Sequence, residues 1–149
     1  MKIRTILVAT DFSDDANAAL EAASQLAKLC GSELKLLHAY HVDIPAIYGR
    51  FGGDFVIPQN ILEPIRQAAE ASIQALVEGE AAKGTDVEGR AVMEHASRAI
   101  LDEAERLPAD LIVMGTRGLT GLKHVLVGST AERVLRLAAC PVLTVKAKS

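Results

Sequence analysis

The chain has 149 residues, of which half are hydrophobic, and a formal net charge of −3 at pH 7. A chain of this length is typical of a single domain, here expected over residues 1–149, that buries about two-thirds of its unfolded surface. The slightly acidic charge and the few aromatic residues argue against a general nucleic-acid-binding protein, which needs a basic face with interleaved aromatic side chains.

Apolar strands alternate with segments of helical period along the chain. We expect strands at 3–9, 34–40, 87–93, 111–114 and 142–145. The first helix carries its apolar face on Ala16, Ala19, Leu20, Ala23, Ala27 and Cys30, and it stops at Gly31. Further helices are expected from Ile61 to near Gly84, up to Pro108, and from Ala131 to Ala138. The alternation predicts a doubly wound α/β fold, with a five-stranded parallel sheet and helices on both faces.

Three local features refine this prediction. Ser13 is the expected N-cap of the first helix, and Asp14 and Asp15 complement the dipole of its first turn. The strand at 87–93 alternates polar and apolar residues, as an edge strand does. Neither Cys30 nor Cys140 belongs to a metal-binding or redox motif, so both are interpreted as small core residues.

Residues 41–60 form the one irregular stretch, with Tyr48, Phe51 and Phe55 among them. Such a segment is long for a connection inside a compact domain, which favours a functional or mobile role. A hydrophobic flap packed over one end of the second helix explains it equally well.

No apolar run approaches the roughly 20 residues that a membrane-spanning helix needs, and residues 1–4 lead into a short strand rather than a signal peptide. We therefore expect a cytoplasmic protein with no membrane partner.

A glycine-rich segment follows the apolar run at 111–114. It begins with Gly115 and Gly118, and after nine further residues it ends in Gly128-Ser129-Thr130, where a helix starts. Glycine lets backbone N–H groups approach a phosphate, and the free N–H groups of a helix start favour negative charge. Arg117, Lys123 and His124 add local positive charge, although they also fit ordinary solvated loop positions. The segment predicts a nucleotide-binding loop.

The glycine spacing differs from the two commoner phosphate-binding motifs. The chain has no Gly-Lys pair, which a Walker loop needs, and no G-x-G-x-x-G sequence. The pattern is G-x2-G-x9-G-[ST]. Together with residues 6–13, 36–39, 109–115 and 140–145, it resembles the ATP-binding branch of the universal stress protein family over essentially the whole chain.

This resemblance implies the strand order 3-2-1-4-5, as in adenine nucleotide alpha hydrolase-like folds. Ligands of such sheets bind where the winding direction reverses, which places the site between the ends of the strands at 3–9 and 111–114. The resemblance implies an ATP site whose residues are Ala9, Thr10, Asp11, Ala39, Met114, Gly115, Arg117, Gly118, Gly128, Ser129 and Thr130. Ala9, Ala39 and Met114 would line the adenine pocket.

Asp11 has two plausible roles. At a strand end that faces a nucleotide, its carboxylate can accept a ribose hydroxyl or help to hold Mg²⁺ (or Mn²⁺) through water. It can also be a simple turn residue before the first helix.

Ser129 and His38 each carry a competing structural interpretation. Residues 129–132 match a capping box, in which the Ser129 hydroxyl accepts the N–H of Glu132 while it also donates to a phosphate. The N–H groups of residues 128–130 would bind the phosphate beside it. His38 is interpreted as a hydrogen-bonded strand-end histidine rather than a catalytic group.

Phosphoryl transfer needs a group that orients the nucleophile. The glycine segment offers only His124, so we expect an ATP-binding stress-response protein with at most slow hydrolysis. The alternatives are a protein–protein interaction module with an empty or AMP-occupied pocket and, less well supported, an adenylating or electron-transfer flavoprotein-like domain. The last strand, extended to Val142–Lys146, exposes an edge that two copies can pair antiparallel, so a homodimer is expected.

Overall fold

The computed structural model describes residues 1–42, 56–119 and 126–148, and its strands form one parallel sheet in the order β3-β2-β1-β4-β5. The strands are β1 (Thr5–Ala9), β2 (Glu33–Tyr40), β3 (Val87–Met93), β4 (Leu111–Gly115) and β5 (Val142–Val145). The predicted strand order and parallel direction are confirmed, and each strand begins within two residues of its expected position. β3 is an edge strand, as its alternating pattern indicated.

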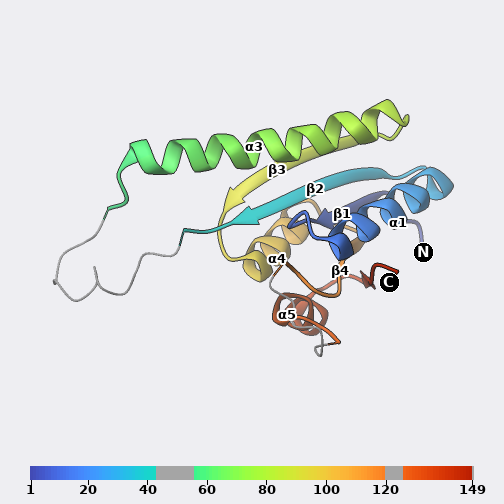
Figure 1. Cartoon of the computed structure of the whole chain (residues 1–149). Helices are drawn as coiled ribbons and strands as arrows, with labels where there is room; N and C mark the ends of the chain where they lie inside the picture. Colours follow the sequence, from blue (N-terminus) through green and yellow to red (C-terminus); the bar gives the residue numbers. More distant parts are fainter. Residues whose placement is uncertain (43–55, 120–125, 149) are drawn as a thin grey trace.

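Helices cover both faces of the sheet (Figure 1). They are α1 (Asp14–Cys30), α3 (Gln59–Ala82), α4 (Ala96–Arg106) and α5 (Ser129–Leu137). The core on one face packs the sheet against α1 and α3, and the core on the other packs it against α4 and α5. Within the described ranges, no helix combines the length and apolar character that crossing a bilayer requires.

The central strand β1 supplies both cores because successive side chains of a strand point to opposite faces. Ile6 and Val8 belong to the core under α1 and α3, whereas Leu7 and Ala9 belong to the core under α4 and α5. All five residues of β1 are buried. Each large apolar side chain buried in this way contributes about 1.5–3 kcal/mol.

α1 begins and ends as its sequence predicts. The Ser13 hydroxyl accepts the N–H of Ala16 at 3.2 Å, and Gly31 ends the helix with a φ of 67°. The assignment of Cys30 to the core was wrong, because its side chain is exposed. Cys30 is the last helical residue, where the chain turns at Gly31 to enter β2, so the apolar period continues past the end of the core. Cys140 is half-buried, and burial raises the pKa of its thiol.

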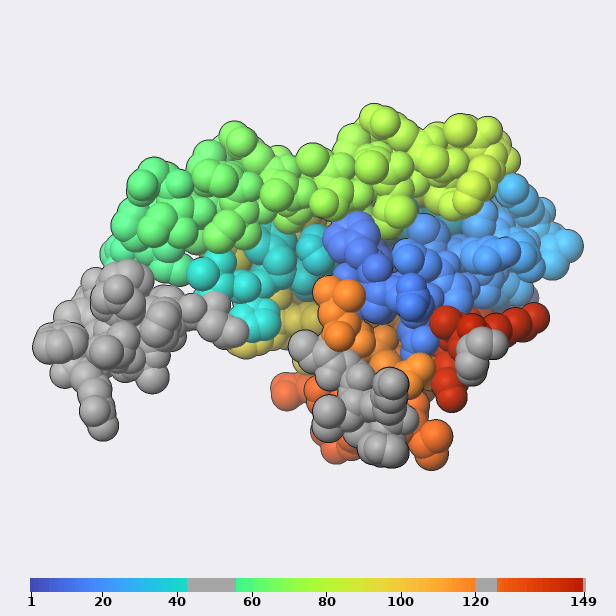
Figure 2. Space-filling view, in the orientation of Figure 1, coloured from blue at the N-terminus to red at the C-terminus, as the bar shows by residue number. Residues whose placement is uncertain are grey.

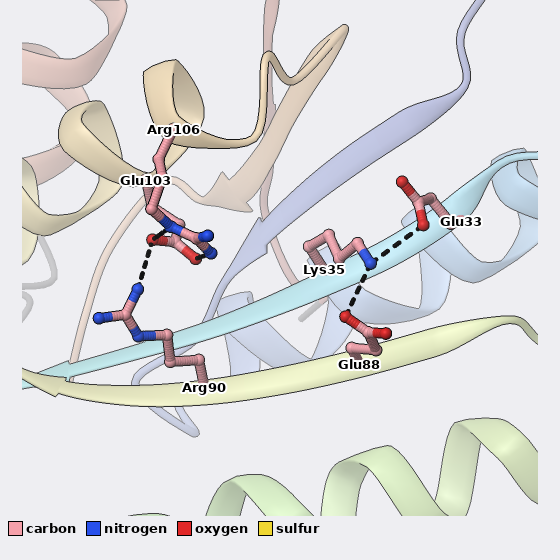
Figure 3. Close-up of polar contacts among 6 residues, drawn as sticks. All are labelled: Glu33, Lys35, Glu88, Arg90, Glu103 and Arg106. Carbon is pink, nitrogen blue, oxygen red and sulfur yellow. Dashed lines mark hydrogen bonds and ion pairs between the residues drawn. The ribbon is translucent and has the colours of Figure 1, made fainter.

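A buried carboxylate ties α4 to the edge strand β3. Glu103 of α4 contacts Arg90 of β3 at 3.1 Å and Arg106 one turn along its own helix at 2.7 Å (Figure 3). The hydrogen bond from Arg106 lowers the pKa of Glu103 and outweighs the opposing effect of burial. Glu103 therefore stays ionised and holds the two elements together.

A second ion-pair group joins β2 to β3. The Lys35 ammonium lies 3.0 Å from Glu33 and 2.8 Å from Glu88 (Figure 3). Lys35 pairs in register with Glu88 across the two strands. The two charged residues of β3 thus have different partners: Glu88 pairs with Lys35 across the strands, and Arg90 contacts Glu103 of α4.

Two glycines near the contact of α3 with β3 give a stability test. A Cβ on Gly89 of β3 would lie 2.6 Å from Val77 Cγ2 and 3.1 Å from Ile73 Cγ1, both on α3, whereas a Cβ on Gly79 would meet nothing within 4 Å. We expect Gly89→Ala to lower the free energy of unfolding by about 1–3 kcal/mol through overpacking. The control Gly79→Ala should raise it by up to about 1 kcal/mol, because alanine favours the helix. Urea unfolding measures both, and equal stabilities would contradict the packing.

Candidate functional site

A pocket of about 690 Å³ lies at the carboxyl ends of the strands, where the winding direction reverses between β1 and β4. The ends of β1, β2 and β4 form its floor, and the starts of α4 and α5 complete it. Open parallel sheets bind their ligands at this position.

The pocket contains every residue that the sequence assigned to the site. Its lining includes Ala9, Thr10, Asp11, Ala39, Met114, Gly115, Arg117, Gly118, Gly128, Ser129 and Thr130. Four separate stretches of sequence therefore meet at one place. Lys123 and His124 lie outside the described residues, as do Tyr48, Phe51 and Phe55.

The turn between β1 and α1 aims Asp11 at the glycine segment. Phe12 has a φ of 64°, and the turn is fixed by the N–H of Phe12, which donates to Thr10 Oγ1, and that of Ser13, which donates to Asp11 Oδ1, each at 3.0 Å. The Phe12 ring also packs against His38, with the ring centroids 4.6 Å apart. Several contacts thus hold Phe12 in a conformation that non-glycine residues rarely adopt.

Asp11 also contacts the glycine segment directly. Its Oδ2 accepts the N–H of Leu119 at 3.0 Å, and a Cβ on Gly118 would lie only 2.6 Å from the same oxygen. The close approach explains why position 118 is glycine. Asp11 therefore has the turn role, and because an ionised carboxylate offers about four acceptor positions, it can still accept a ligand.

His38 is a hydrogen-bonded strand-end residue, as predicted. Its Nδ1 lies 2.9 Å from the carbonyl oxygen of Thr10, so this nitrogen must carry the proton and donate. The side chain supports the floor of the pocket and is not part of its lining.

The start of α5 differs from the predicted capping box. Gly128 is the N-cap, and the N–H of Glu132 donates to the carbonyl oxygen of Gly128 at 2.9 Å rather than to the Ser129 hydroxyl. The helix begins one residue earlier than a capping box at Ser129 requires, so Ser129 occupies the first helical position. Its hydroxyl makes no cap bond and is exposed toward the pocket.

The N–H of Gly128 was wrongly expected to be free for a phosphate. It donates to the carbonyl oxygen of Thr116 at 2.7 Å and so closes the glycine segment on itself. The N–H groups of the next residues, Ser129, Thr130 and Ala131, are in the first helical turn, where they have no intrahelical acceptor. These amides and the helix dipole favour an anion in the pocket.

Arg117 is held by a carboxylate that sequence reasoning interpreted only as a dipole partner. Arg117 Nε lies 3.3 Å from Asp15 Oδ2, which also accepts the Thr116 hydroxyl at 2.8 Å. Burial raises the pKa of Asp15, but hydrogen bonds from Ala147, Thr116 and Arg117 outweigh it and leave the pKa below its usual value. Asp15 is therefore ionised. No local pattern distinguishes it from Asp14, which is exposed.

Sequence reasoning also missed lining residues after β2, at the start of α4 and in α5. They include His41 after β2, His95 and Ser97 at the start of α4, and Arg133 in α5. The rings of His41 and His95 lie 4.7 Å apart. None of these residues belongs to a sequence motif, so the sequence carried no signal that they line the pocket.

The pocket combines two chemical environments. Apolar residues at the strand ends, among them Ala9, Leu37 and Met114, can pack against a flat ring. Arg117 and the first amides of α5 can bind an anionic group. Among the described residues, no group of three or more histidines, cysteines or carboxylates forms a metal site.

This is the architecture of a doubly wound α/β protein with a pocket at its switch point. The model of the universal stress protein family matches residues 2–146. The chain belongs to the universal stress protein family.

Individual relatives agree with this assignment. Universal stress protein YxiE of Bacillus subtilis is 32% identical over 145 residues, which are 95% of this chain and 97% of YxiE. The structure of universal stress protein UspA from Lactobacillus plantarum has a TM-score of 0.79 at 25% identity and covers 97% of this chain and 99% of its own. The structure of the universal stress protein from Archaeoglobus fulgidus in complex with dAMP has a TM-score of 0.66 at 26% identity. The match covers 98% of this chain and 100% of the Archaeoglobus chain.

Proposed function

We propose that this protein binds ATP in the pocket between β1 and β4 and acts as a nucleotide-dependent stress-response regulator. The observation that carries the proposal is the convergence of Gly115, Gly118 and the start of α5 on one pocket that also has an apolar floor. The adenine would pack on Ala9, Ala39 and Met114. The phosphates would bind the amides and hydroxyls of Ser129 and Thr130.

The nucleotide bound by the Archaeoglobus fulgidus relative supports an adenine ligand. The regulatory role rests on membership of the family.

A divalent cation would bind with the phosphates. Asp11 is the one carboxylate in the described lining of the pocket, and its two oxygens already accept backbone N–H groups. The remaining acceptor positions fit a water of the Mg²⁺ or Mn²⁺ shell, because Mg²⁺ usually keeps several waters. The ion would neutralise phosphate charge beside this carboxylate.

ATP hydrolysis would be slow at most. A fast reaction needs a group that positions the attacking water. Asp11, the one carboxylate in the described lining of the pocket, already accepts the N–H groups of Ser13 and Leu119. This arrangement suits binding rather than turnover.

A second candidate is an interaction module whose pocket holds AMP. The dAMP complex of the Archaeoglobus fulgidus relative favours it, because that ligand carries a single phosphate. The two candidates differ in what the glycine segment contributes, since only ATP carries further phosphates for it to bind.

Gly118→Ala tests the nucleotide site. The added Cβ would lie 2.6 Å from Asp11 Oδ2, so the carboxylate and the segment must separate. We expect the affinity for ATP–Mg²⁺ to fall about tenfold or more, which corresponds to about 1.4 kcal/mol. Calorimetric titration measures it, with Gly79→Ala as a control outside the pocket. Equal ATP affinity in a folded Gly118→Ala variant would move the site elsewhere, and a wild type that binds AMP at least as tightly as ATP would favour the AMP module.

We also propose a homodimer through the edge strand β5, extended over Val142–Lys146. Within the described residues, β5 pairs only with β4. The carbonyl oxygens of Pro141 and Val145 accept the N–H groups of Ile112 in β4 and of Thr116 directly after β4. Because backbone groups of alternate residues point to the same edge, those of Val142 and Thr144 face outward. A second copy can pair with them antiparallel about a twofold axis.

Thr144→Pro tests this interface. Proline removes an N–H that faces outward and leaves the β4–β5 hydrogen bonds in place. We expect the wild type and a Thr144→Val control to sediment as dimers at micromolar concentration and Thr144→Pro to sediment as a monomer. The interface is wrong if the wild type is a monomer, or if a folded Thr144→Pro variant remains a dimer.

A further inference from the structure

Asp15 joins two segments that are far apart in the sequence. Its Oδ2 accepts the Thr116 hydroxyl at 2.8 Å, the N–H of Arg117 at 3.2 Å and Arg117 Nε at 3.3 Å. Its Oδ1 accepts the N–H of Ala147 at 3.0 Å. One carboxylate thus bridges the glycine segment and the residues that follow β5.

The environment of Asp15 is that of a built contact rather than a surface charge. The residue is only 5% exposed, whereas its neighbour Asp14 is exposed. A buried carboxylate is costly unless hydrogen bonds compensate it, and removing its partners leaves the charge unpaired. The four donors satisfy Asp15, and each one comes from outside α1.

The backbone around Asp15 fixes the same segments. A Cβ on Gly115 would lie 2.9 Å from Asp15 Cβ, so the start of α1 packs directly on the beginning of the glycine segment. Thr116 donates its N–H to the carbonyl oxygen of Val145 at 2.9 Å and accepts the N–H of Gly128 at 2.7 Å. Thr116 therefore contacts α1, the end of β5 and the second half of the glycine segment.

Figure 2 shows these parts on one face of the molecule. The first residues of α1, in blue, lie between the residues after β4, in orange, and the C-terminal residues, in red. Asp15, at the start of α1, bridges the other two parts through its hydrogen bonds with Thr116 and Ala147.

Arg117 is the group through which Asp15 acts on the pocket. Nε of its guanidinium is directed to Asp15, and the terminal nitrogens carry four further N–H groups. Arg117 lines the pocket and Asp15 does not. Asp15 thus sets the direction of a cation that can contact phosphate.

We propose that Asp15 is a positioning residue of the nucleotide site, and that through Ala147 it makes phosphate affinity depend on the backbone after β5. This inference rests on the proposed nucleotide binding. Asp15 orients Arg117 and Thr116, and the Ala147 amide holds the other side of the carboxylate. Because coupling between two sites is reciprocal, bound ATP also stabilises the position of residues 146–148.

The experiment changes each side of the bridge separately. Asp15→Asn keeps the shape but replaces one accepting oxygen with an NH₂ group, so either Ala147 or the glycine segment loses its acceptor. Ala147→Pro removes only the N–H donor at a residue outside the pocket. Ala147→Gly, which keeps the N–H, and Asp14→Asn, which changes an exposed charge, are the matched controls.

Calorimetric titration of each variant with ATP–Mg²⁺ and with AMP measures the effect. We expect Asp15→Asn and Ala147→Pro each to weaken ATP binding about fivefold to tenfold. AMP binding should weaken less, because Arg117 would contact the phosphates that ATP has and AMP lacks. The double variant should bind ATP only slightly less tightly than the single variant that has the lower affinity, because both changes break the same network. The two controls should bind as the wild type does.

Several results overturn the proposal. The bridge is not coupled to the pocket if Ala147→Pro binds ATP as tightly as Ala147→Gly, or if the two changes are additive. The claim that Asp15 positions Arg117 for phosphate is wrong if the affinities for ATP and AMP fall equally. Ala147→Pro keeps the test decisive if Asp15→Asn fails to fold. A wild type that binds neither nucleotide refutes the proposed function itself, which is a separate outcome.

Discussion

The pairing of β1 with β4 is the constraint on which the site depends. Ile6, Leu7 and Val8 lie in register with Leu111, Ile112 and Val113, although about a hundred residues separate the two strands. Because the strands are parallel, their carboxyl ends meet at one edge of the sheet. The turn that carries Asp11 therefore faces the glycine segment after β4, and neither segment forms the pocket alone.

Two carboxylates fasten the glycine segment, and their negative charge would oppose the anionic ligand proposed for the pocket. Asp11 accepts the N–H of Leu119, and Asp15 accepts the N–H of Arg117 together with its side chain. These hydrogen bonds spread the negative charge over backbone dipoles and one guanidinium. The first amides of α5 and the terminal nitrogens of Arg117 would still favour a phosphate in the pocket.

The sequence predicted the sheet and much of the pocket because both depend on local patterns. Buried runs such as 6–9 and 111–114 predict strands from their composition alone, and the glycine spacing assigned Gly118 and Gly128 to one site, where both line the pocket. The errors arose where a one-residue difference in a helix boundary, or a contact with a distant segment, determines the role of a residue. The capping-box prediction was wrong because the helix starts one residue earlier, at Ser129, and Cys30 continues the apolar period past the end of the core. Asp15 could not be distinguished from Asp14, because its partners lie at Thr116, Arg117 and Ala147.

Binding of an adenine nucleotide between the glycine segment and the start of α5 is what we propose for this protein. Amide NMR spectra recorded during a titration with ATP–Mg²⁺ test it most directly, because each backbone N–H reports its own surroundings. We expect the largest shifts on Thr116, Arg117 and Gly118 and on Ser129, Thr130 and Ala131. Saturating ATP that leaves these amides unshifted, or shifts only residues elsewhere, would contradict it.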